Sequence, residues 1–379
     1  MAEVVICAVA RTPFARCRGA LSERSAVELG IHVVKGLLAR ADIEAASGII
    51  EEVLFGQVLT AGAGQAPARQ VALGAGLPHS TPATTINKVC GSSLKAVMMA
   101  ANSIRSGEYD VIIAGGMESM THAPHFAHKV SRSEFGELKP TMIHDGLWDV
   151  YNDEHMGNTG ETVSLEFEIS REAADAFSTR SHRHADAAWN EGVMDFEVIS
   201  TDGIDRDEGI RVDCDLSELK PAFTPDGRVT AGNSSQLSDG AAAVLVASRE
   251  AAETNGWPVL ATLLDQCTSG VEPARVMAAP IPAIEMLLSR NDLTMDDLAY
   301  VEHNEAFAAA SCAIAKACSI PDEKFNPHGG AVAIGHPLGA TGARCLMALI
   351  NALRQAGGGK GIVTICLGGG NAVAMLIEA

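Results

Sequence analysis

Short apolar runs alternate with helical patterns through the first 120 residues. The run Val4–Val9 is β-branched and apolar on both faces, which predicts a strand buried on both sides. Ser25 precedes a segment whose apolar residues recur at helical spacing, so we expect a helix with Ser25 as its N-cap. Those apolar residues are Val27, Ile31, Val34 and Leu38. The same criteria predict a strand over Val53–Leu59, a short helix over Pro67–Gly74, a helix from Cys90 to Gly107 and a buried strand over 110–116.

The last third of the chain repeats this order. We expect a strand and a turn over 298–307, a helix over 306–318, then a strand, a Gly-rich turn and a helix over 329–358, and a buried strand from 362. An order shared by both ends favours duplicated α/β units. The predicted fold class is therefore α/β, with a parallel or mixed sheet and helices on its faces.

The middle of the chain breaks the pattern. Aromatic, acidic, basic and histidine residues are interleaved from about 121 to 223, and one clear helix is predicted from its N-cap Ser170 to near Gly192. This region is typical of an insertion or lid that carries a ligand surface. We therefore divide the chain into a first half of residues 1–120 and 224–256, an inserted loop domain over 121–223, and a second half over 257–379.

Composition narrows the classes of function. The 379 residues carry 28 Lys+Arg and 47 Asp+Glu, and the net charge of −19 argues against nucleic-acid or anionic-membrane partners. Nine cysteines without a CxxC pair argue against a disulfide scaffold or a zinc ribbon. No apolar run reaches the roughly 18 residues of a membrane span, and the N-terminus lacks the order of a signal peptide. We expect a soluble, cytoplasmic protein.

Two turns carry reactive side chains in matching places. Cys90 stands where a strand meets a helix, whose N–H groups and dipole would lower the pKa of a thiol. A buried, inert cysteine is an equally good interpretation of that position. His336 lies in the Gly-rich turn of the second half, between Gly335 and Pro337, where a functional role is favoured over a surface loop histidine.

Two more candidates follow strands of the second half. Cys366 ends a predicted buried strand, and the glycines 368–370 after it would free N–H groups for an oxyanion. The alternative is a turn with an inert thiol. Asn304 ends the neighbouring strand and could orient a water or cap the next helix. Two thiols, an imidazole and an amide suggest carbon–acyl chemistry through a thioester, with one thiol holding the acyl group and the other moving a proton.

Other motifs indicate little. The histidines His122, His125 and His128 lack partners at ligand spacing and are interpreted as solvated loop residues, while His182 and His184 point to different sides of a helix. We expect no metal site. Neither GxGxxG after a first strand nor GxxxxGK[ST] is present, so a nucleotide cofactor site of these types is not expected.

Four motifs, in this order, resemble the thiolase family: NKVCGSSLKAV, NEAFA, GGAVAIGHPLGATGAR and CLGGGN. The resemblance covers nearly the whole chain through RTPFARCRGAL, GAGQAPARQ, IIAGGMESM, EHMGNTGE and AGNSSQLSDGAA. It is strongest toward the acetoacetyl-CoA branch, and DGLWDVYNDEHMG favours its short-chain side. The resemblance implies two similar α/β halves in a layered αβαβα arrangement with an inserted loop domain.

The resemblance also implies roles. Cys90 would carry the acyl group, Cys366 would be the acid/base at the second acetyl-CoA, and His336 would activate Cys90 and donate to the thioester oxygen of that substrate. Asn304 would hold a water in the same oxyanion hole, while the N–H groups of Cys90 and Gly368 would form the other hole. Residues implied near coenzyme A are Ser235, Ala231, Leu237, Phe223, His155, Met156 and Phe307.

The implied activity is the reversible condensation of two acetyl-CoA to acetoacetyl-CoA and CoA, or thiolysis of short 3-oxoacyl-CoA. CoA thioesters are expected as substrates and no cofactor is expected to be permanently bound. A homodimer or homotetramer is expected. Residues 203–219 are shorter than the family pattern and 272–283 have alanines where glycines are common, so nucleotide contacts and chain-length preference stay open. A thiolase for longer or branched 3-ketoacyl-CoA and an inactive thiolase-like binding subunit are the alternatives, whereas a decarboxylating synthase is disfavoured by Cys366.

Overall fold

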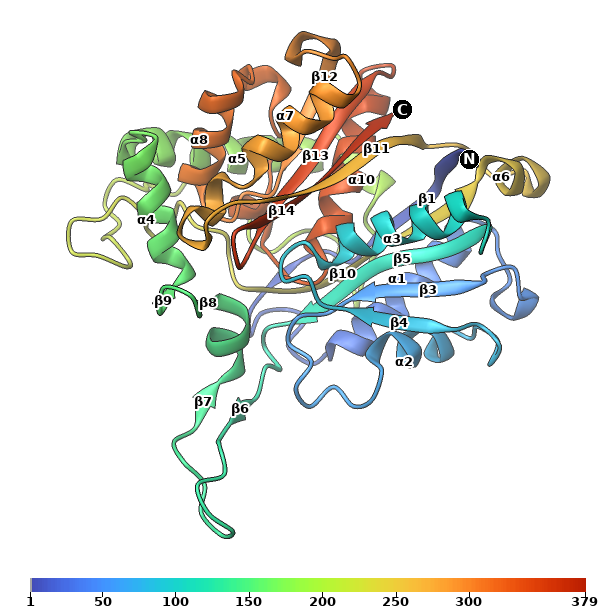
Figure 1. Ribbon diagram of the computed structural model, residues 1–379, viewed down its shortest axis with the longest axis horizontal. Helices are drawn as coiled ribbons and strands as arrows, with labels where there is room; N and C mark the ends of the chain where they lie inside the picture. The colour runs from blue at the N-terminus through green and yellow to red at the C-terminus, as the bar shows by residue number, and fades with distance from the viewer. Residues whose placement is uncertain (1) are drawn as a thin grey trace.

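The computed structural model describes residues 2–379, in which ten strands join one hydrogen-bonded sheet (Figure 1). In the first half, its order is β1 (Val4–Arg11), β10 (Ser238–Ser248), β5 (Val111–Ser119), β3 (Glu52–Gly56) and β4 (Ala83–Ile86), and the two-residue β2 (Ala15–Arg16) also pairs with β10. In the second half, it is β11 (Ala261–Gly270), β14 (Asn371–Glu378), β13 (Lys360–Leu367) and β12 (Leu298–His303). The mixed α/β sheet confirms the predicted fold class.

The two halves have the same strand directions. β1–β10 and β10–β5 are antiparallel and β5–β3 is parallel, as β11–β14 and β14–β13 are antiparallel and β13–β12 is parallel. The halves meet where β1 pairs with β11 through only Val5–Thr262 and Ile6–Ala261. The duplication predicted from the order of elements is therefore present in the topology.

Helices form three layers around the two half-sheets. α1 (Ala26–Arg40) and α2 (Pro67–Gly74) cover the outer face of the first, while α7 (Pro280–Arg290) and α8 (Ala308–Cys318) cover the outer face of the second. α3 (Ser92–Ser106) and α10 (Thr341–Gln355) pack between them. Neighbouring residues of β10 alternate between the two sides: Val244 and Val246 join the central core, and Leu245 joins the outer core. The arrangement is αβαβα.

The local signals explain where most helices begin and end. Ser25 caps α1 through a capping box with Glu28, Pro67 begins α2, and Gly107 ends α3 in the left-handed region with φ +76°. Ser170 caps α5 (Arg171–Asn190), as predicted. These ends depend on local chemistry, so sequence alone identifies them.

Three predictions were wrong in detail. Residues 331–334, expected as a strand, form the short helix α9 (Ala331–Ile334), because Val332 N–H is held by the Glu305 carboxylate instead of a neighbouring strand. The strand expected over Val53–Leu59 ends at Gly56, because the Glu118 carboxylate accepts the N–H groups of Val58 and Leu59.

The third error concerns the buried face of α1. Val27 and Ile31, which the helical spacing placed on that face, are only half-buried. Leu29, Val33 and Leu37 are fully buried instead. The apolar stripe of this helix is wide enough for either choice, and its packing on the sheet decides.

The inserted region lies against the second half. Its helices α4 (Met156–Glu166) and α5 pack on α8, and the π-helix Met142–Leu147 leads into them. The hairpin of β6 (His125–Phe126) and β7 (Lys139–Pro140) projects away from the body of the molecule (Figure 1). No helix within residues 2–379 combines the length and apolarity needed to cross a membrane.

Candidate active site

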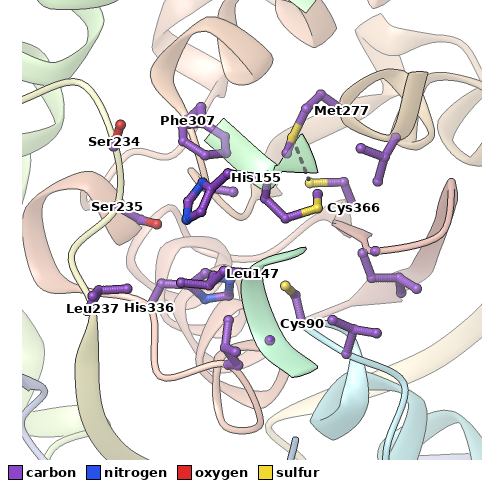
Figure 2. Close-up of a pocket in the computed structure, with 18 of the residues that line it drawn as sticks. Cys90, Leu147, His155, Ser234, Ser235, Leu237, Met277, Phe307, His336 and Cys366 are labelled. Carbon is purple, nitrogen blue, oxygen red and sulfur yellow. Dashed lines mark hydrogen bonds between the residues drawn. The ribbon is translucent and has the colours of Figure 1, made fainter. Parts of the chain in front are cut away.

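A cavity of about 290 Å³ lies between the two halves and the inserted region (Figure 2). Its walls are mostly apolar. The residues predicted from the sequence that line it are Cys90, His336, Cys366, Gly368, Ser235, Leu237, Phe223, His155, Met156 and Phe307. Asn304 is fully buried beside His336, whereas Ala231 is exposed and does not line the cavity.

Cys90 stands on a tight turn between β4 and α3. Val89, just before it, has φ +47°, a left-handed conformation that is strained for a β-branched residue. The turn is held by Val89 N–H donating to Asn87 Oδ1 over 3.0 Å and by Ser92 Oγ donating to Val89 O over 2.6 Å. These bonds hold the strained backbone, which carries Cys90 into the cavity.

The pKa of the Cys90 thiol is raised, contrary to the expectation from the helix terminus. Burial is the main cause and the neighbouring Cys366 adds to it, while the hydrogen bond from the residue's own backbone N–H opposes it. Gly91 is the N-cap of α3, so Cys90 lies just outside the helix. Cys90 is therefore a thiol at neutral pH, and it needs a base to become a nucleophile.

His336, which lines the same cavity, is the candidate for that base. Thr341 Oγ1 donates to Pro337 O over 2.9 Å, so it accepts from Nδ1–H of His336, 2.6 Å away. Nε2 then carries the free lone pair and lies 3.4 Å from Asn304 Nδ2. Burial lowers the pKa of His336 to about 3, with Arg344 contributing, so the imidazole is neutral and can accept a proton.

Asn304 faces His336 from the end of β12. The next helix has Phe307 as its N-cap, so Asn304 does not cap it and that alternative is excluded. Asn304 Oδ1 is buried without a protein partner among the described residues. The amide therefore directs Nδ2 toward the imidazole, while Oδ1 is left to accept a hydrogen bond from an ordered water.

Cys366 occupies the opposite wall, near the end of β13. Its Sγ lies 3.8 Å from Met277 Sδ (Figure 2). Gly369 and Gly370 turn the chain at φ +86° and +77°, which only glycine adopts readily. Burial raises the pKa of Cys366 to about 12, so this thiol too is protonated at neutral pH rather than tuned toward it.

Aromatic rings form the lid side of the cavity. Phe223 stacks on His155 at 4.9 Å and meets Phe307 edge to face at 6.4 Å between ring centroids. Gly157 in α4 makes this possible, because a Cβ there would lie 2.1 Å from the Phe223 ring. His155 also caps α4, its Nδ1 accepting the Gly157 N–H over 3.0 Å. The lid wall is thus fixed by packing.

The segment from Ser235 to Leu237 is hydrogen-bonded to the loop that carries Asn304. Ser235 N–H donates to Ala306 O over 2.9 Å, and His336 N–H donates to Gln236 O over 3.0 Å. Ser235 and the exposed Leu237 therefore line the cavity from a strip that also supports His336.

Several residues of the site were missed by sequence reasoning. Met277 and Glu118 contact groups that lie 89 and 221 residues away along the chain, and Thr341 was not singled out among the residues near His336. Glu118 accepts the Gly339 N–H over 3.0 Å and so holds the turn that carries His336. For Thr341, a hydroxyl five residues after His336 at the start of a helix was the available signal.

The other histidines lie outside the cavity. His122, His125 and His128 are exposed, whereas His182 is 2 % exposed and accepts the Arg211 N–H at Nδ1. Within residues 2–379, no group of three or more His, Cys, Asp or Glu side chains is arranged to hold a metal ion.

Comparison with known proteins assigns the chain to a family. Residues 4–250 match the family described as thiolase, N-terminal domain, and residues 257–379 match thiolase, C-terminal domain. The chain belongs to the thiolase family. The resemblance stated from its motifs is confirmed.

Individual thiolases match over their full length. Acetyl-CoA acetyltransferase of Cupriavidus necator is 45% identical and covers 100% of both chains, and the cytosolic acetyl-CoA acetyltransferase of Rattus norvegicus is 41% identical over 99% of this chain and 98% of that protein. A crystal structure of Acat5 thiolase from Ascaris suum in complex with coenzyme A is 37% identical, with a TM-score of 0.95 over 99% of each chain. The likeness confirms the predicted thiolase fold.

Proposed function

We propose that this protein is an acetyl-CoA acetyltransferase that interconverts two acetyl-CoA with acetoacetyl-CoA and CoA through an acyl-cysteine. The observation that carries this is the convergence of two thiols and a neutral imidazole on one apolar cavity, with a buried amide beside the imidazole. The relatives named acetyl-CoA acetyltransferase support the same activity.

The first half-reaction transfers an acetyl group to Cys90. His336 Nε2 takes the Cys90 proton, Sγ attacks the acetyl-CoA carbonyl, and the carbon–sulfur bond to CoA breaks. Cys366 gives its proton to the leaving CoA thiolate. The N–H groups of Cys90 and Gly368 hold the oxyanion. An acetyl-Cys90, a Cys366 thiolate and a protonated His336 remain.

The second half-reaction forms the carbon–carbon bond. The Cys366 thiolate removes an α-proton from the second acetyl-CoA, and His336 Nε2–H and a water on Asn304 stabilise the enolate oxygen. The enolate attacks acetyl-Cys90, the bond to Sγ breaks, and His336 returns its proton to Cys90. All three groups regain their starting protons, and thiolysis is the reverse.

The substrate contacts belong to the same proposal. The residues that would contact CoA and line the cavity are Ser235, Leu237, Phe223, His155, Met156 and Phe307. Ala231, which is exposed outside the cavity, would contact CoA beside Ser235. We also propose the division of the chain into a first half (1–120 with 224–256), an inserted domain (121–223) and a second half (257–379).

A cytoplasmic location belongs to the proposal as well, and the rat relative named cytosolic supports it. Association into a homodimer or homotetramer is supported by the edge position of β4 and the projecting β6–β7 hairpin (Figure 1).

The decisive experiment is CoA-dependent cleavage of acetoacetyl-CoA by the wild type and by Cys90→Ala, with a longer 3-ketoacyl-CoA in parallel. Turnover that is lost in the variant, with one acetyl group on Cys90 of the wild type by mass spectrometry, is expected. Faster cleavage of the longer substrate would favour the longer-chain alternative. Absence of turnover with either substrate in folded protein would favour the inactive binding subunit.

A further inference from the structure

A carboxylate is buried behind the cavity without touching it. Glu305 follows Asn304 directly and is 0 % exposed. Its Oε1 accepts from Asn326 Nδ2 over 2.8 Å, and its Oε2 accepts from Ser181 Oγ over 2.6 Å and from Val332 N–H over 3.2 Å. Three donors compensate for the burial of the carboxylate, so each of them is held firmly.

The donors come from three separate segments. Ser181 belongs to α5 of the inserted region, Asn326 to a loop of the second half, and Val332 to α9, which leads into His336. Asn326 also brackets the end of β12: its Nδ2 donates to His303 O over 2.9 Å and its Oδ1 accepts the His303 N–H over 2.8 Å. Glu305 thus ties both the Asn304 loop and the His336 segment to one point.

The packing around the Glu305 carboxylate is tight. Gly330 lies so close to Glu305 that a Cβ would meet the carboxyl carbon at 2.5 Å, and its N–H donates to Ser181 Oγ over 3.0 Å. A shift of the carboxylate would therefore move the backbone that precedes His336. The contact to Ser181 transmits the same constraint to the lid helix α5.

We propose that Glu305 is a positioning residue, whose carboxylate fixes the separation between the Asn304 amide and His336 Nε2. The inference rests on the proposed function. The 3.4 Å contact between Asn304 and His336 depends on two loops that are 32 residues apart in sequence, and Glu305 joins them. Because only the enolate step uses both Asn304 and His336, that step depends most on the separation that Glu305 fixes.

The test is Glu305→Gln. This substitution keeps the side-chain volume but replaces one carboxylate oxygen, which accepts a hydrogen bond, with an NH2 group that would face one of the three donors. A displacement of about 1 Å can cost about 100-fold in rate, so we expect thiolysis kcat to fall about 10- to 100-fold. Exchange of labelled CoA into acetyl-CoA needs Cys90 and His336 but not the enolate step. Because Glu305 also supports the segment that precedes His336, exchange should fall too, but at least about threefold less than thiolysis, with the KM for CoA unchanged.

Glu161→Gln is the matched control. Glu161 is a buried carboxylate of α4 that accepts the N–H groups of Arg228 and Val229 over 2.8 and 2.9 Å, and neither donor belongs to the segments of Asn304 or His336. This variant should lose thermal stability while the ratio of thiolysis to exchange stays at the wild-type value. A control that shifts this ratio as Glu305→Gln does would contradict the specific role.

Two outcomes with Glu305→Gln overturn the proposal. Unchanged thiolysis would show that the carboxylate positions nothing, and an equal fall of thiolysis and exchange would show a role in the fold alone. A wild-type protein that lacks both reactions would instead reject the proposed function. The positioning role of Glu305 would then be tested by a crystal structure of the variant, in which an unchanged distance between Asn304 and His336 would overturn it.

Discussion

Nδ1 of His336 lies 2.6 Å from Oγ1 of Thr341, which itself donates to Pro337 O. The hydroxyl can then only accept from the imidazole, so it fixes the tautomer in which Nε2 faces the cavity as a base. The chemistry proposed for Cys90 depends on this tautomer.

Replacing the hydroxyl should therefore damage catalysis. Thr341→Val keeps the shape but removes the acceptor, and we expect kcat for acetoacetyl-CoA thiolysis to fall about 100-fold because the imidazole is no longer held as a base. Thr341→Ser retains the hydroxyl and should stay within about 3-fold of the wild type. Steady-state kinetics of both variants provides the measurement, and equal rates would refute the tautomer argument.

The raised pKa of Cys90 predicts how the free enzyme reacts with iodoacetamide. Because Cys90 is a buried thiol, its thiolate fraction grows with pH throughout the accessible range. We expect its alkylation rate, followed by mass spectrometry of the Cys90 peptide, to rise about tenfold per pH unit between pH 7 and 9. A plateau below pH 8 would instead indicate that the thiolate and a protonated His336 already coexist at rest.

Burial of His182 predicts a loss of stability in acid. Burial, with a contribution from Arg211, lowers its pKa in the folded protein from 6.5 to about 4. The unfolded chain then binds the extra proton between these values, so the stabilisation is present above pH 6.5 and declines as the pH falls toward 4. At pH 5 this histidine should cost about 2 kcal/mol.

His182→Asn tests this contribution. The Asn amide oxygen can still accept the Arg211 N–H that bonds to Nδ1 in the native protein. Urea unfolding at pH 7 and pH 5 should show a smaller drop in the free energy of unfolding for the variant, by about 2 kcal/mol. The exposed His79→Asn is the control, and a drop equal to that of the wild type in both variants would contradict the assignment.

The close packing of α10 on α3 predicts that Gly342 cannot be replaced by a larger residue without loss of stability. A Cβ at Gly342 in α10 would lie 2.3 Å from the backbone N of Leu94 in α3, so Gly342→Ala must push the two helices apart. We expect a loss of about 1 to 3 kcal/mol in the free energy of unfolding. At Gly36 in α1 the Cβ would meet the terminal Cδ1 of Ile199, which can rotate away.

Gly36→Ala is thus the matched control, and it should change stability by less than about 1 kcal/mol. Urea denaturation of both variants measures the difference. Equal effects would mean that the helices of the central layer can separate at little cost.

The sequence located three reactive side chains that line the cavity. Cys90 stands just before a helix start, His336 lies between Gly335 and Pro337, and Cys366 is followed by a glycine turn, so local signals marked all three positions. The sequence did not predict the properties that depend on how deeply a group is buried, such as the pKa of a thiol. The helix terminus beside Cys90 suggested a lowered pKa, yet desolvation dominates, and no local pattern shows how much protein will surround a thiol.

Tertiary contacts also overrode local preference. The apolar segment 331–334 was expected as a strand, but Glu305 accepts the Val332 N–H and the segment forms a helical turn. The donors of Glu305 lie 21, 27 and 124 residues away along the chain, so nothing near Glu305 indicated the cluster.

The place of β10 in the sheet sets the order in which the chain can fold during synthesis. β10 is hydrogen-bonded between β1 and β5, yet it follows the whole inserted region in sequence. A nascent chain that ends before residue 238 lacks the strand that joins β1 to β5, so the first half stays open until the insertion has left the ribosome. In the second half, β14 has the same place between β11 and β13 and is likewise the last of the four strands to be made. It follows β13 directly, however, so no inserted region has to be synthesised before that half can close.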